Sequence, residues 1–146
     1  MLSGLWPPED RGLPSPKIHH IGIAVESINE ALSLYQDALG VSPTTRAEVP
    51  AEGVVVAMLP VGDSRIELLE ATGADSPITK FLSRRGPGLH HIAVLVEDLE
   101  ASVERLRASG RRLVADEIRL GAHGYRYVFV HPASAGGVLL ELIEEP

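Results

Sequence analysis

The chain has 146 residues, of which 45% are apolar and 23% are charged, a composition typical of one globular domain with a hydrophobic core. Its 20 acidic and 13 basic residues give a net charge of −7, which argues against a nucleic-acid or anionic-membrane partner. The sequence contains no cysteine. Disulfide frameworks, thiolate metal sites and a cysteine nucleophile are therefore excluded, and histidines and carboxylates remain as the strong metal ligands.

The first 16 residues are rich in proline and lack the basic and apolar stretches of a secretory signal. We predict that residues 1–16 form an extended, weakly ordered tail and that residues 17–146 form a single domain. No apolar run approaches the roughly 18 residues that are needed to span a bilayer. We expect a soluble protein of the cytoplasm, because the lack of cysteine is compatible with a reducing compartment.

The first predicted element is a strand, Ile18-His19-His20-Ile21-Gly22-Ile23-Ala24-Val25. A helix should follow, since Ser27-Ile28-Asn29-Glu30 has the capping-box pattern, apolar residues recur with helical spacing as far as Leu39, and Gly40 suits a C-terminal cap. Strands are then predicted over residues 45–49, 53–59 and 65–70. A short helix capped by Ser76, with Pro77 at its first position, completes this half.

The second half repeats the first. Leu89-His90-His91-Ile92-Ala93-Val94-Leu95-Val96 matches the first strand, and Asp98 can cap a helix that Gly110 ends. Strands are predicted over residues 113–118, 125–131 and 139–144. We therefore predict an α+β fold of two tandem β-α-β-β-β modules, about 17–86 and 87–146, whose sheets curl around a shared cleft, within this chain or across a dimer.

Each repeat offers one histidine and one glutamate at matching places, namely His20, Glu67, His91 and Glu141. A lone histidine or glutamate on a strand is usually structural or solvated, but pseudo-twofold packing would bring all four to one axis. Nitrogen and oxygen donors without sulfur suit a divalent ion such as Mg, Mn, Co, Ni or Zn. We predict a metal site at these residues.

Strand alternation separates the neighbouring histidines from this site. His20 shares its face with the small residues Gly22 and Ala24, as a site with open volume requires. We expect His19 and His90, on the opposite face, to pair only with backbone or solvent. His123 and His131 are weaker candidates for a function.

Together these features resemble the methylmalonyl-CoA epimerase family of the vicinal oxygen chelate superfamily, from about Lys17 to Glu144. The motifs that carry the resemblance are the two His-His strands, Asp75-Ser76-Pro77-Ile78, Gly121-Ala122-His123-Gly124 and the segment from His131 to Leu142. The resemblance implies a divalent ion held by His20, Glu67, His91 and Glu141, and an acyl-CoA substrate.

The sequence departs from that family at two places. Family members usually carry Asp where His19 stands, and some carry Gln at the place of Glu67 together with a Glu, proposed as a base, at the place of Val56. Val56 cannot move a proton, so any second base has to come from elsewhere.

An epimerase has to remove a proton from the carbon between the thioester and the carboxylate and return one to the opposite face. A cation that touches oxygens of both groups would stabilise the enolate and hold the carbon between two bases. We assign these bases to Glu67 and Glu141, with His123 as a reserve candidate. Because a bound dication lowers the pKa of a carboxylate, either the ligand loosens from the ion during turnover or another group transfers the proton.

The phosphates of CoA call for cations, and the chain offers Lys80, Arg84 and Arg85 near the joint of the repeats and Arg46, Arg119 and Arg126 elsewhere. No phosphate-cradle motif singles out one of them. Dimerisation is common in such folds, and we expect a homodimer. Two alternatives stay open: a glyoxalase-I-like lyase acting on a glutathione adduct, and a metal-free small-molecule-binding protein. A ring-cleaving dioxygenase is disfavoured, because it needs one ligand fewer.

Overall fold

The centre of the fold is an antiparallel pair of strands, β1 (Lys17–Ala24) and β5 (Gly88–Leu95), in a computed structural model that describes residues 16–146. The tail predicted for residues 1–16 lies outside the described residues except for Pro16. β4 (Ser64–Ala71) runs parallel to β1, and β8 (Leu140–Glu144) runs parallel to β5. β3 (Val54–Val61) and β2 (Thr45–Val49) extend the first side, and β7 (Arg126–Val130) and β6 (Arg119–Leu120) extend the second.

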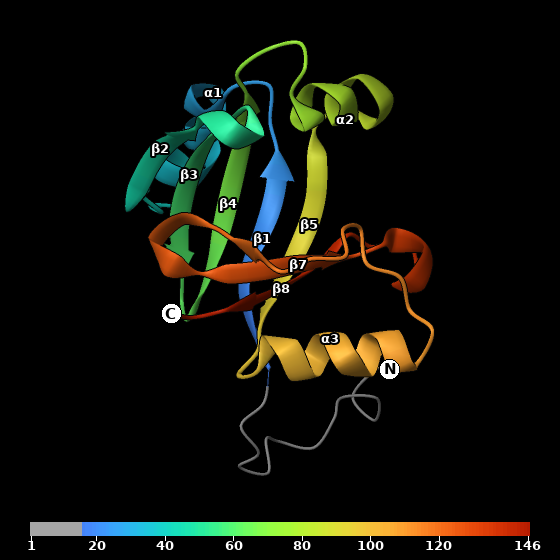
Figure 1. Ribbon diagram of the computed structural model, residues 1–146. Helices are drawn as coiled ribbons and strands as arrows, with labels where there is room; N and C mark the ends of the chain where they lie inside the picture. Colours follow the sequence, from blue (N-terminus) through green and yellow to red (C-terminus); the bar gives the residue numbers. More distant parts are fainter. Residues whose placement is uncertain (1–15) are drawn as a thin grey trace, which may run out of the picture.

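The eight strands form one sheet in the order β2-β3-β4-β1-β5-β8-β7-β6. From the central β1–β5 pair out to each edge, the strands of the two halves of the sheet have the same arrangement. Figure 1 shows β7 and β8 crossing the direction of β1 to β4, so the sheet is curled and has a concave face. The predicted α+β fold of two repeated modules is confirmed.

Two helices cover the convex face, one for each repeat. α1 (Ile28–Leu32) begins as predicted, with the Ser27 hydroxyl accepting from the Glu30 N–H, and continues as the π-helix η1 (Ser33–Ala38). α3 (Leu99–Ala108) is capped by Asp98, whose carboxylate accepts from the Ala101 N–H. Each helix buries its first residue, and the two helices thereby seal separate cores, which contain Ile28, Ala57, Leu59 and Leu68 under α1, and Leu99, Val103, Val128, Val130 and Leu142 under α3.

A third helix, α2 (Pro77–Arg85), joins the repeats and begins at Ser76, which caps it as predicted. Its buried Ile78 packs with Ala24, Val54 and Leu69. Short 3₁₀ turns fill the connections at η2 (Pro50–Glu52), η3 (Ala122–Gly124) and η4 (Pro132–Ser134). No helix within residues 16–146 is long and apolar enough to cross a membrane.

The strand predicted over residues 113–118 is wrong. β6 comprises only Arg119–Leu120, and Leu113 makes a single isolated bridge to Val130. The side chains of Leu113 and Ile118 instead pack against the core under α3. Their apolar character, which suggested a strand, serves to cover that core.

Candidate metal centre

The structure brings together the four side chains predicted as ligands, which are His20, Glu67, His91 and Glu141. They surround two small residues at the centre of the sheet. Gly22 on β1 lies opposite the histidine of β5 and level with the glutamate of β4. Ala93 on β5 lies opposite the histidine of β1 and level with the glutamate of β8. Each repeat therefore contributes its ligands through the same strand register.

The donor atoms of this cluster face one another. The Nε2 atoms of His20 and His91 are 2.9 Å apart, and one carboxylate oxygen of Glu141 lies 3.2 Å from each of them. The oxygens of Glu67 lie 3.7 Å from His20 Nε2 and 3.5 Å from His91 Nε2. The four side chains are between 4% and 13% exposed, so the cluster is largely shielded from water.

Gly22 is required by the position of His91. A Cβ atom on Gly22 would lie 2.2 Å from Cε1 and 2.3 Å from Nδ1 of the His91 ring. Carbon atoms in ordinary contact are about 3.5–4.0 Å apart. Any larger residue at position 22 would therefore force the ring of His91 away from the other ligands.

A bulge in the β1–β5 pair occurs immediately before each ligand histidine. In the register, Ile18 pairs with Val94 and His20 pairs with Ala93, so His19 is an extra residue on its strand, and the register shifts again at His90. Strand alternation fails at such a bulge. The prediction that His19 and His90 pair only with backbone or solvent is therefore wrong.

Both extra histidines instead hold a ligand ring. The Nδ1 atoms of His19 and His20 are 2.8 Å apart, and those of His90 and His91 are 2.9 Å apart. The guanidinium of Arg65 also donates to the backbone carbonyl of His19, at 3.3 Å. When the Nδ1–H of a ligand ring donates to its neighbour, its Nε2 carries a free lone pair that points into the cluster. The same second-ring contact thus occurs in both repeats.

The pKa values reflect a buried cluster that holds opposite charges. Burial lowers the pKa of His20, but the hydrogen bond to Glu141 and the charges of Glu67 and Glu141 outweigh burial and raise it. Burial raises the pKa of Glu141, but the hydrogen bonds and charges of His20 and His91 outweigh burial and lower it to about 2. The pKa of Glu67 is raised, mainly by burial. Burial lowers the pKa of His19 and of His90 to about 4, so both neighbours are neutral at ordinary pH.

The residues present fit a divalent cation. Two ring nitrogens and two carboxylates that face one buried point leave lone pairs and negative charge uncompensated unless a cation or protons lie among them. His20, Glu67 and His91 each place a donor atom within 4.8 Å of the others. A second acidic group within residues 16–146, formed by Asp98, Glu100 and Glu144, is different, because the guanidinium of Arg126 pairs with two of its carboxylates.

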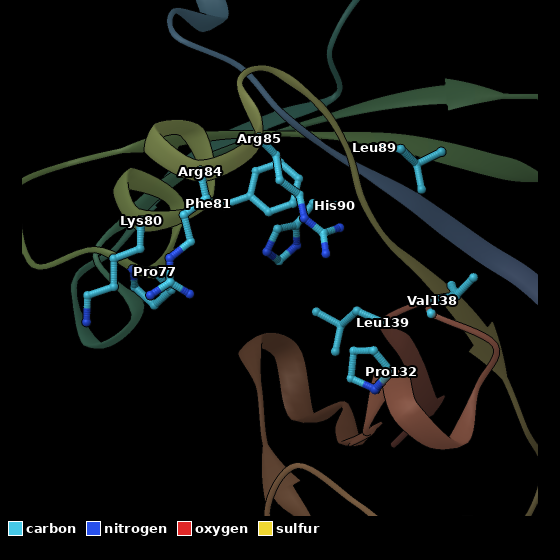
Figure 2. Close-up of a pocket in the computed structure, with 11 residues that line it drawn as sticks. Pro77, Lys80, Phe81, Arg84, Arg85, Leu89, His90, Pro132, Val138 and Leu139 are labelled. Atoms are coloured by element: carbon cyan, nitrogen blue, oxygen red, sulfur yellow. The ribbon is translucent and has the colours of Figure 1, made fainter.

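A groove of about 390 Å³ opens beside His90, between α2 and the segment that leads into β8 (Figure 2). Three cations of α2 line it, namely Lys80, Arg84 and Arg85. The ring of Phe81 contacts the ring of His90, with centroids 4.9 Å apart, and the Arg85 guanidinium lies 5.8 Å from the Phe81 centroid. The groove therefore combines positive charge with an aromatic wall, and its lining residue His90 contacts the ring of the ligand His91.

The other histidines and arginines that the sequence analysis singled out make other contacts or lie elsewhere on the surface. Arg126 pairs with Glu100 and Glu144, and His131 caps η4 by accepting from the Ala133 N–H. His123 is exposed in η3 with a left-handed φ of 58°. Of the cations that the sequence offered, Lys80, Arg84 and Arg85 are the ones that line the groove.

The curled double-repeat sheet and its central His–Glu cluster define the class of protein. A family model of the Glyoxalase/Bleomycin resistance protein/Dioxygenase superfamily matches residues 19–129. The chain is 38% identical over 127 residues to the mitochondrial methylmalonyl-CoA epimerase of Mus musculus, covering 86% of this chain and 71% of the relative. It is 36% identical to the ethylmalonyl-CoA/methylmalonyl-CoA epimerase of Cereibacter sphaeroides, covering 86% of this chain and 96% of the relative.

Solved structures agree with these relatives. The crystal structure of methylmalonyl-CoA epimerase from Mycobacterium tuberculosis superposes with a TM-score of 0.82 at 39% identity, covering 88% of this chain and 87% of that one. A methylmalonyl-CoA epimerase in complex with methylmalonyl-CoA and NH4+ superposes with a TM-score of 0.81 at 35% identity, covering 89% and 94%. The chain belongs to the methylmalonyl-CoA epimerase family of this superfamily, a family of isomerases that act on acyl-CoA thioesters.

Proposed function

We propose that this protein interconverts the R and S forms of methylmalonyl-CoA. The observation that carries the proposal is the meeting of His20, Glu67, His91 and Glu141 at one buried point in a chain whose relatives are named epimerases of this substrate. The reaction needs charge stabilisation beside a carbon acid and proton acceptors on two sides. A cation held by the four side chains would meet the first need, and a carboxylate from each repeat would meet the second.

The four side chains are the proposed ligands of a divalent ion, for which Mg, Mn, Co, Ni and Zn are the candidates. When bound, such an ion supplies electrostatic stabilisation to the negative charge that develops on the thioester oxygen. His20 and His91 would present their Nε2 atoms to the ion, and His19 and His90 fix the orientation of their rings. The role of Gly22 is to leave space for one of these rings.

Glu67 and Glu141 are the proposed bases, one from each repeat. The two carboxylates are unequal. Burial raises the pKa of Glu67, which suits a proton acceptor, whereas the histidines hold the pKa of Glu141 at about 2. We therefore expect Glu67 to be the stronger base of the pair.

The groove beside His90 is the proposed site for the CoA portion of the substrate. Lys80, Arg84 and Arg85 place three positive charges along it, as a pyrophosphate requires. The groove leads to His90, next to the ligand His91. A substrate bound along it would direct its acyl end towards the metal centre.

The assembly and location belong to the same proposal. We propose that the protein acts as a homodimer in the cytoplasm. Sedimentation of the purified protein and fractionation of the source cells test these two points separately.

The test of the function is proton exchange at the substrate carbon. The protein is stripped with EDTA, reloaded with Mn²⁺ or Co²⁺, and incubated with one enantiomer of methylmalonyl-CoA in D₂O. We expect deuterium uptake and epimerisation that are lost on stripping and restored on reloading, and lower uptake in Glu67→Gln and Glu141→Gln. Absence of exchange in the reloaded protein would refute the epimerase assignment, and full exchange in both variants would refute the two-glutamate assignment.

A further inference from the structure

Two large apolar side chains stand beside the metal centre, at matching places in the two repeats. Met58 on β3 lies directly opposite Glu67 in the β3–β4 pair. Phe129 on β7 lies directly opposite Glu141 in the β7–β8 pair. Side chains that face each other across neighbouring antiparallel strands lie on the same side of the sheet, with their Cβ atoms about 4.5–5.5 Å apart. Met58 and Phe129 therefore flank the two proposed bases on the concave face.

Core packing does not account for these two side chains. The residues on either side of Met58 are buried in the core under α1, and the residues on either side of Phe129 are buried in the core under α3. Met58 and Phe129 themselves are only partly buried and belong to none of the three cores within residues 16–146. Apolar side chains that line a concave site beside a few polar groups are typical of a ligand-binding surface.

The chemistry of the proposed substrate calls for apolar walls at this place. The thioester and carboxylate oxygens of methylmalonyl-CoA have to face the four ligands, and the reacting carbon lies between these two groups. The alkyl substituent of that carbon therefore points away from the ligands and towards the walls of the concave face. Since the bases act on the two faces of the same carbon, the side chains beside the bases also border its substituent.

The wall that the second repeat contributes is rigid. The ring of Phe129 lies edge to face against the ring of His91, with centroids 5.9 Å apart, and against the ring of Tyr127, with centroids 5.8 Å apart. The hydroxyl of Tyr127 donates to Oε1 of Glu52, in the first repeat, at 3.0 Å. A Cβ atom on Gly121 would lie 3.2 Å from the Tyr127 ring, so this ring is also held from behind. Phe129 is thus fixed on both sides.

The wall that the first repeat contributes is adaptable. Met58 has an unbranched side chain with three rotatable bonds, which can change shape around a ligand. Its partner in the β2–β3 pair is Thr45, which is exposed to solvent. The outer side of Met58 therefore borders solvent rather than a core. An enlarged substituent would displace Met58 before it displaced the fixed ring of Phe129.

We propose that Met58 and Phe129 are specificity-determining residues that set the size of the alkyl group accepted on the reacting carbon. Phe129 is the fixed wall, and Met58 is the wall that yields. The inference rests on the proposed function and concerns the acyl part of its substrate. Methylmalonyl-CoA and ethylmalonyl-CoA differ by one methylene at this carbon, and one methylene in an apolar pocket changes kcat/KM by about 10- to 200-fold.

The test measures the ratio of kcat/KM for ethylmalonyl-CoA to kcat/KM for methylmalonyl-CoA. The proteins compared are wild type, Met58→Ala and Phe129→Leu, each loaded with Mn²⁺ or Co²⁺. A general loss of metal or of activity affects both substrates alike and cancels in the ratio. We expect each variant to raise the ratio about tenfold over wild type, because each removes bulk beside the substituent.

A binding measurement without turnover accompanies the kinetics. Propionyl-CoA and butyryl-CoA carry a methyl and an ethyl group on the same carbon but lack the second carboxylate. Their dissociation constants are measured by calorimetric titration of the metal-loaded proteins. Relative to wild type, Met58→Ala should shift the ratio of the two constants by about fourfold in favour of butyryl-CoA, the contribution of one buried methylene.

Val61→Ala is the matched control. Val61 is an apolar residue at the end of β3, pairs with Ser64 and is 45% exposed, so it does not flank a ligand. We expect its ratio to equal that of wild type. A ratio within about twofold of wild type in Met58→Ala or in Phe129→Leu would refute the assignment of that residue, as would a shift towards methylmalonyl-CoA. Failure of the metal-loaded wild type to epimerise either substrate would instead refute the proposed function, and the binding ratio would still test Met58.

Discussion

Replacement of Gly22 by alanine tests the steric basis of the metal centre. The added Cβ would meet three atoms of the His91 ring at 2.2, 2.3 and 2.8 Å. Because relaxed contacts between carbon atoms are about 3.5–4.0 Å, the ring has to retreat by more than about 1 Å. The backbone at Gly22 does not require glycine for conformational reasons, since its φ lies outside the left-handed region. The clash with His91 therefore accounts for the whole expected effect.

The magnitude follows from the tolerance of metal ligation. Ligand distances in metal sites vary by about 0.2 Å, so a shift of about 1 Å removes His91 from the ligand set. Loss of an outer-shell partner lowers metal affinity by about 10- to 100-fold. Loss of a ligand should lower it by at least about 100-fold. The overpacked strand pair should also lose about 1–3 kcal/mol of unfolding free energy.

Calorimetric titration of the stripped protein with Mn²⁺ or Co²⁺, together with thermal unfolding, measures both effects. Gly73→Ala is the matched control, because a Cβ there would meet no atom within 4 Å and its φ is not left-handed. We expect the control to bind metal like wild type. Unchanged metal affinity in Gly22→Ala would show that the ring of His91 is not held where the structure places it, or that it is not a ligand.

Three further predictions follow from the site. His19→Ala and His90→Ala should each lower metal affinity by about 10- to 100-fold in calorimetric titration, because each removes the Nδ1 partner of a ligand ring; wild-type affinity in both would show that the rings orient themselves. The pKa of Glu141 is lowered to about 2 in the folded chain, so its ionised form stabilises the metal-free protein above its ordinary pKa of 4.5, and this contribution disappears as the pH falls towards 2. The stability difference between wild type and Glu141→Gln, measured by unfolding in EDTA, should therefore narrow with acidification, and a constant difference would contradict the ion pairing. Arg84→Ala should raise KM for methylmalonyl-CoA about tenfold with a much smaller change in kcat, and more weakly so at high salt, whereas Arg111→Ala outside the groove should not; equal KM values for the two variants would remove the groove as the CoA site.

The repetition in the sequence predicted the fold and the four clustered side chains because duplicated modules repeat their strand register. His20 and His91 recur in matching strands, and the pairing of these strands carries them to one centre. The helix caps at Ser27 and Asp98 could also be predicted from the sequence, because capping depends on residues close in sequence.

Features that depend on contacts between residues distant in the sequence could not be predicted from the sequence. The bulges at His19 and His90 arise from the pairing of two strands and break the alternation that a single strand predicts. The hydrogen bond between Glu52 and Tyr127 joins segments that share no local pattern. The cations of α2 became distinguishable only when the groove beside His90 brought them together.

The central claim is that one cation lies among two histidines and two glutamates donated by both repeats. Anomalous diffraction from crystals grown with Mn²⁺ tests it most directly, because the signal locates the metal without reference to activity. We predict a single strong anomalous peak between His20, Glu67, His91 and Glu141. No peak at that point, or a peak only at the acidic group of Asp98, Glu100 and Glu144, would contradict the account.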